Sequence, residues 1–142
     1  MWGILISMLS GALMSIQGVF NTGVTEKSSV WVAAGWVQLT AFLTCVIAWL
    51  ITGRQPVGAL FEVHPRYLLL GGILGAAITY TVIQGMASLG PAKAALLIVV
   101  TQLAVAYLIE LFGLFGAEKA AFQLRKLIGL LIAVAGVMIF QK

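Results

Sequence analysis

The sequence predicts an all-α membrane protein with five transmembrane helices. Two observations carry this prediction. Apolar residues make up 62% of the 142 residues and charged residues only 8%, whereas a soluble domain has about 45–50% and about 25%. The apolar residues also form runs of about 20, the length that crosses a bilayer as a helix. A helix pairs its backbone N–H and C=O groups internally, and this is required in a bilayer because lipid offers them no hydrogen-bonding partner.

Five apolar runs divide the chain, and we expect them to form one transmembrane domain over residues 1–142. The first run lacks the basic residues that open a signal peptide, so we expect it to be a span. The connections are too short to hold a soluble domain. The expected spans cover residues 2–21, 30–51, 67–88, 92–113 and 125–140.

Basic residues lie mainly between the runs, where they set orientation in the membrane. With five spans, the side that holds the N-terminus receives Arg54, Arg66, Lys119, Arg125 and Lys126, and the other side receives Lys27, Lys93 and Lys142. The positive-inside rule then favours a cytoplasmic N-terminus by a small margin. Insertion in both orientations stays an alternative. The net charge is +4. Because the basic residues are scattered among the connections and span ends, this charge does not indicate nucleic-acid binding.

The first run carries small and polar residues along one side. At about 100° per residue, its glycines and serines share an arc of roughly 160° with Gln17 and Asn21. Small residues let helices approach, so packing alone explains them. The two amides need hydrogen-bonding partners in a medium of low dielectric constant. They either bond to other helices or line a hydrated cavity.

The second, third and fourth runs each add a glutamine. Polar groups that converge from four helices predict a cavity open to one face of the membrane. Two interpretations stay open, because the amides either bind a small solute or bond only to each other. The candidate substrate-binding residues are Gln17, Asn21, Gln38, Gln84, Thr101 and Gln102.

Two further candidates lie in the last two runs. Glu110, near the end of the fourth run, is the acid best placed to carry a coupling proton. Its alternative role is an ion pair at the membrane interface with Arg125 or Lys126. In the fifth run, small residues form a row that suits either a dimer contact or packing within the chain. This row consists of Gly129, Ala133 and Gly136.

The sequence does not suggest an enzyme, a metal site or a bound cofactor. Cys45 and His64 are the only cysteine and the only histidine, so neither a disulfide within the chain nor a metal cluster is expected. The chain has no glycine-rich phosphate loop, no HExxH motif, and no set of residues that resembles a catalytic triad.

Four segments, in order, resemble the short YdcZ-type inner-membrane proteins of the drug/metabolite transporter superfamily. Each motif alone has low specificity, but the ordered set covers nearly the whole chain. The segments are QGVFN (17–21), PRYLLLGGILGA (65–76), LGPAKAALLIVVTQLAVAYLIELFGLFG (89–116) and RKLIGLLIAVAGVMIF (125–140).

This resemblance implies a multi-pass protein of the bacterial inner membrane that exports a small solute. It implies half of a ten-helix architecture, completed by an inverted copy of the chain or by an oppositely oriented paralogue. Gln17, Asn21, Gln102 and Glu110 fall within the family's motifs. The sequence departs at Lys93, where a small or apolar residue is expected, and at Glu110, where aspartate is commoner. The alternatives are a dual-topology ion channel and a non-transporting subunit of a larger membrane complex.

Overall fold

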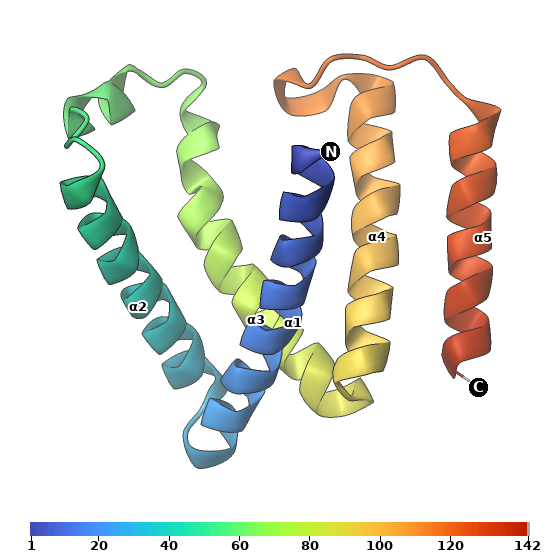
Figure 1. Cartoon of the computed structure of the whole chain (residues 1–142), viewed down its shortest axis with the longest axis horizontal. Helices are drawn as coiled ribbons and strands as arrows, with labels where there is room; N and C mark the ends of the chain where they lie inside the picture. Colours follow the sequence, from blue (N-terminus) through green and yellow to red (C-terminus); the bar gives the residue numbers. More distant parts are fainter. Residues whose placement is uncertain (142) are drawn as a thin grey trace. The chain divides into compact units, whose positions relative to one another are not determined.

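The computed structural model describes residues 1–141, with side chains as far as Phe140. Within this part of the chain the structure is helical and contains no strand, so the all-α prediction is confirmed (Figure 1). The elements are α1 (Trp2–Lys27), α2 (Val30–Ile51), the 3-10 helices η1 (Val57–Glu62) and η2 (Arg66–Leu70), α3 (Gly71–Leu89), α4 (Pro91–Phe112), the 3-10 turn η3 (Leu114–Gly116) and α5 (Leu124–Gln141).

Four helical segments of the described chain are long and apolar enough to cross a membrane. They are Trp2–Lys27, Val30–Ile51, Arg66–Leu89 and Pro91–Phe112. Helix α5 has 18 residues, and its role as a fifth span stays a prediction.

Helix α1 continues further than the sequence predicted. The expected connection over residues 22–29 is reduced to Ser28 and Ser29. Thr22, Thr25 and Ser28 each donate a hydroxyl hydrogen bond to the carbonyl four residues earlier, at 2.8–2.9 Å. These bonds satisfy the hydroxyls without breaking the helix, so α1 carries its charged end out to Lys27. Ser29 then caps α2 by accepting from the backbone N–H of Val32.

Gly90 and Pro91 form the turn before the fourth helix. Gly90 has φ of +81° and Pro91 is the first residue of α4. A positive φ favours glycine, and proline lacks the N–H that would be unpaired at a helix start. At the other end, Gly113 ends α4 in the left-handed conformation, with φ of +64°.

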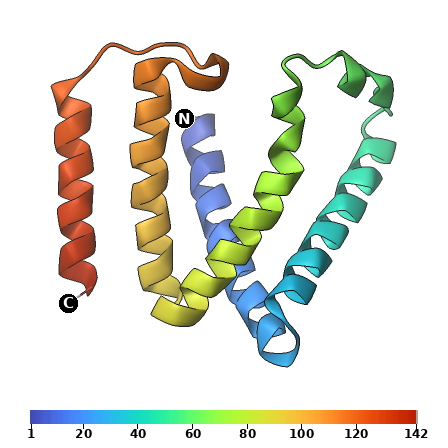
Figure 2. The same ribbon diagram turned by 180° about the vertical axis from the view of Figure 1, so that it is seen from behind.

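The described chain forms two compact units, Met1–Ser88 and a second that begins at Leu89. In the first unit, α1 and α2 are antiparallel neighbours joined by the two-residue connection, while η1 and η2 join α2 to α3 (Figures 1 and 2). The buried residues of this unit lie towards the end at which α1 joins α2: Gly18, Asn21, Ala33, Ala34, Ile83 and Met86.

Gly18 is the point at which α1 meets α3. A Cβ atom built at this position would overlap the thioether of Met86 and would lie 3.5 Å from Val82. Any larger residue would require the Met86 side chain to move, so glycine favours this close approach, which is the role small residues have between membrane helices. From behind, the crossing of the two helices is visible in Figure 2.

The second unit pairs α4 with α5. The less exposed residues of α5 recur every three or four positions and include Leu127, Leu130 and Val137. Gly129 and Gly136 are exposed, and a Cβ atom built at either would meet nothing within 4 Å. Gly129 lines a recess between α4 and α5, whereas Gly136 does not line it.

Gly18→Val is expected to destabilise the first unit. A branched side chain cannot be accommodated by a shift of Met86 alone, and overpacking costs about 1–3 kcal/mol. The matched control is Gly11→Val, at an open position of the same helix. Detergent-induced unfolding, followed by circular dichroism, measures both. Equal stability of the two variants would contradict the contact.

Candidate functional site

A groove between α1 and α2 is the larger of the two recesses described here. Its volume is about 860 Å³, within the range of small-molecule sites. It is lined by Ser10, Leu13, Met14, Ile16, Gln17, Phe20, Asn21 and Val24 of α1, and by Trp36, Val37, Thr40, Ala41, Thr44 and Cys45 of α2.

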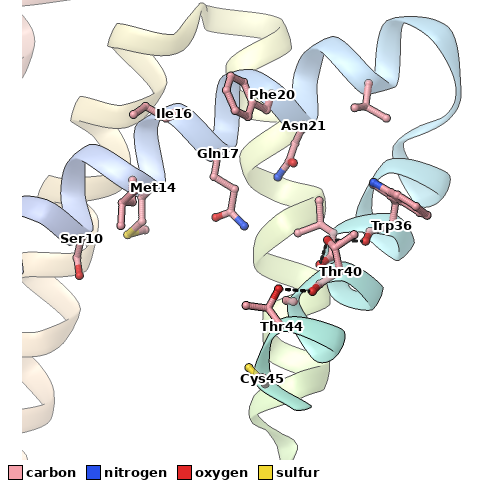
Figure 3. A pocket seen from close by; sticks show the side chains of 14 residues that line it. Ser10, Met14, Ile16, Gln17, Phe20, Asn21, Trp36, Thr40, Thr44 and Cys45 are labelled. Atoms are coloured by element: carbon pink, nitrogen blue, oxygen red, sulfur yellow. Dashed lines mark hydrogen bonds between the residues drawn. The ribbon is translucent and has the colours of Figure 1, made fainter. Parts of the chain in front are cut away.

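Two of the predicted site residues, Gln17 and Asn21, lie in this groove. They are four residues apart and so share one face of α1. Figure 3 shows both amides pointing from α1 towards α2. Asn21 is only 8% exposed, whereas Gln17 is exposed.

Asn21 as a whole is only 8% exposed, and its amide forms no hydrogen bond with another described residue. No fully buried side-chain nitrogen or oxygen of the described residues lacks a partner. The amide atoms of Asn21 must therefore keep a little exposure, and the groove is where they point. An amide that faces the groove with its hydrogen-bonding groups unused is available to a polar group that enters from outside the chain.

The α2 side of the groove presents hydroxyl oxygens. Thr40 donates its hydroxyl hydrogen to the carbonyls of Trp36 and Val37, both at 3.0 Å. Thr44 donates to the carbonyl of Thr40 at 2.8 Å (Figure 3). Because each hydrogen is already used, both oxygens are left to accept hydrogen bonds from a ligand.

Gln38 occupies a different side of α2. Its Nε2 donates to Oγ1 of Thr79 in α3 at 3.3 Å, and it lies against Gly75. At about 100° per residue, Gln38 is about 160° around the helix from Thr40. Its amide therefore links α2 to α3, and its predicted role in binding is not tested by this geometry.

Gln84 lies with two aromatic residues. Its Nε2 donates to the hydroxyl of Tyr80 at 3.4 Å. The Tyr80 ring stacks on that of Trp31, with centroids 4.7 Å apart. The remaining predicted site residues, Thr101 and Gln102, are exposed positions of α4 in the second unit. The expected convergence of all these amides on one cavity stays a prediction.

Glu110 lies in a smaller recess of about 390 Å³ between α4 and α5. Its carboxylate pairs with Lys126 at 2.9 Å, one of the two partners that the sequence offered. The ammonium also lies 5.7 Å from the ring centroid of Tyr107. The Tyr107 hydroxyl bonds to the backbone of Gln123. These contacts join the end of α4 to the start of α5.

The residues on the α2 side of the groove are not among the substrate-binding residues predicted from the sequence. Trp36, Thr40 and Thr44 are spaced by four residues, a period that places them on one helical face. This spacing was the available signal, but threonines that bond to their own helix are common in membrane spans and do not identify a site. No group of acidic, histidine or cysteine side chains in the described residues could hold a metal.

The surface of the helices indicates a lipid environment. Within the four apolar windows of the candidate spans, only 6%, 11%, 6% and 0% of the residues are buried. Large apolar side chains such as Trp2, Phe42 and Leu131 are more than half exposed. Exposed apolar surface on this scale marks contact with a membrane or with other protein.

One family model matches residues 2–139, nearly the whole chain, and its description is "Putative inner membrane exporter, YdcZ". Comparisons with curated proteins and with solved structures return no match.

Replacing single glutamines by leucine is expected to distinguish an amide that stabilises the fold from an amide that has no partner within the chain. Gln38→Leu removes the bond to Thr79 and lowers the free energy of unfolding by about 0.6 kcal/mol, the average for bonds between membrane helices. Gln17→Leu removes no recorded bond and leaves that free energy unchanged. Unfolding of the two variants in mixed micelles measures the difference. A larger loss at Gln17 would show that its amide has a structural partner.

Proposed function

The chain belongs to the YdcZ family of inner-membrane exporters, and from this premise we propose that it moves a small solute by alternating access, as half of an antiparallel dimer. The family match and the apolar helices place the protein in the inner membrane. The observation that supports a transport role most directly is the α1–α2 groove, in which Asn21 is buried without a recorded partner.

The groove has the features of a solute site. Its walls are mostly apolar, and its polar groups come from facing turns of two helices. Sites for small molecules commonly combine an apolar lining with few convergent polar groups. Gln17 and Asn21 are the proposed centre of binding. Gln38, Gln84, Thr101 and Gln102 remain proposed contributors in other conformations of the transport cycle.

An inverted partner is proposed because a single chain leaves most of its helix surface uncovered. The proposed contact row on α5 is Gly129, Ala133 and Gly136; Gly136 is exposed with open space beside it, and Gly129 borders the recess between α4 and α5. With five spans the basic residues are divided five to three between the two sides, a margin small enough to permit insertion in both orientations. Two inverted copies related by an axis in the membrane plane have the symmetry that supports alternating access.

Glu110 is proposed to couple transport to protons. When its carboxylate is ionised, it is held by Lys126 at 2.9 Å. Protonation would release Lys126 and loosen the connection between α4 and α5. Because both side chains are about half exposed, the pair itself adds little stability. It can therefore break and form again during a cycle.

Transport in proteoliposomes tests the function. A carrier gives a flux that saturates with solute concentration, whereas a channel gives a faster flux that does not saturate. A panel of neutral, cationic and anionic aromatic solutes supplies the probes. Absence of flux for every probe would favour the non-transporting subunit.

Glu110→Gln is expected to remove the pH dependence of this flux, because the variant cannot exchange a proton at that position. The matched control is Glu118→Gln, which changes an exposed acid in the connection before α5. Initial flux rates between mildly acidic and mildly alkaline pH measure the effect. An unchanged pH profile in Glu110→Gln would remove this residue from the mechanism.

Labelling of intact cells is expected to show both orientations. The reporter is Gly58→Cys in η1, an exposed position, in a chain that also carries Cys45→Ser. A membrane-impermeant thiol reagent should label about half of the chains if both orientations insert equally. Cys45→Ser alone is the unlabelled control. Labelling of nearly all or none would require an oppositely oriented paralogue as the partner.

A further inference from the structure

We infer that the α1–α2 groove takes an uncharged solute that has an apolar body and an amide-type polar end, with Asn21 bound to that end. This inference rests on the proposed transport function and assigns to it a site and a class of solute.

The lining contains no charged side chain. None of its 14 residues is Asp, Glu, Lys, Arg or His. An ion that entered would lose water without meeting an opposite charge, which is costly in a low-dielectric environment. The groove therefore selects against charged solutes.

The polar groups match a solute that both donates and accepts. Asn21 offers two N–H donors and a carbonyl oxygen, and Gln17 offers the same set one turn away. Thr40 and Thr44 act as acceptors, since their hydroxyl hydrogens are bonded to the backbone of α2. A carboxamide carries both N–H groups and a carbonyl, so it can pair with both sides of the groove.

The remaining wall accommodates an apolar body. The apolar part of the lining includes Phe20, Trp36, Leu13, Met14 and Val37. A lipid acyl chain would also fit against these residues. It has no group that can bond to Asn21, however, and would cover the amide that faces the groove without giving it a partner. The solute with a polar end satisfies both parts of the lining.

Cys45 supplies the reporter, because the only cysteine of the chain lines the groove. The probes are three molecules of nearly equal size: naphthalene-2-carboxamide, naphthalene-2-carboxylate and naphthalen-2-ylmethylammonium. At a carboxamide concentration of about ten times its Kd, alkylation of Cys45 by N-ethylmaleimide should slow about tenfold. The carboxylate and the ammonium should leave the rate unchanged.

A second reporter excludes an effect of probe dissolved in the lipid. Leu43→Cys in a Cys45→Ser chain places the thiol on α2 at an exposed position that does not line the groove. Its alkylation rate should be the same with and without each probe. Equal slowing at this position would assign the effect to the bilayer and overturn the site.

Variants of Asn21 test the polar contact. Asn21→Leu should abolish protection of Cys45, while Thr81→Leu, outside the groove, should retain it. Asn21→Asp introduces a carboxylate of nearly the same shape. In alkaline buffer it should reverse the preference, so that the ammonium probe protects Cys45 and the carboxamide does not. This reversal tests the contact even if Asn21→Leu fails to fold.

Several results would overturn the inference. Equal protection by a charged probe in the unaltered chain would refute the solute class. Carboxamide protection that persists in both Asn21 variants would refute the role of Asn21. A groove filled by lipid, or by a second copy that cross-links through Cys45, would give no protection by the carboxamide. Failure of the transport proposal is a separate result: Cys45 is protected, but proteoliposomes show no saturable carboxamide flux.

Discussion

Moving an apolar side chain from lipid to a contact between helices gains no hydrophobic free energy, because lipid is equally apolar. The packing of this chain follows from that constraint. Helices in hydrocarbon associate through close backbone approach and through hydrogen bonds. The first unit has one clear example of each. Gly18 lets α1 approach Met86 of α3, and Gln38 bonds to Thr79. With few such contacts, most of the helix surface is left for lipid or for a partner.

The same constraint positions the candidate site. Gly18 and Asn21 are three residues apart, so the contact that fixes α1 against α3 also fixes the direction of Asn21. Both residues are buried. The groove then opens on the side of α1 that carries Gln17. A packing residue and a proposed binding residue thus occupy neighbouring turns of one helix.

The sequence was sufficient for the local features of the fold. Runs of apolar residues located the helices, and Gly90 with Pro91 located a turn. The sequence also offered Lys126 as a partner for Glu110, as found. It did not reveal that Gln38 faces α3 and Thr40 faces the groove, because a helical wheel gives relative directions only. The absolute rotation of α2 depends on its contacts with α3, which the pattern of residues does not contain.

The groove runs lengthwise between two helices, and this direction determines how a solute reaches it. Its α1 lining extends from Ser10 to Val24, about 21 Å at the helical rise of 1.5 Å per residue. The hydrocarbon core of a bilayer is about 30 Å thick, so such a slot meets acyl chains along most of its length. A solute would enter sideways from the leaflet. Its partition coefficient into the bilayer, as well as its affinity for the amides, would then set the occupancy of the site.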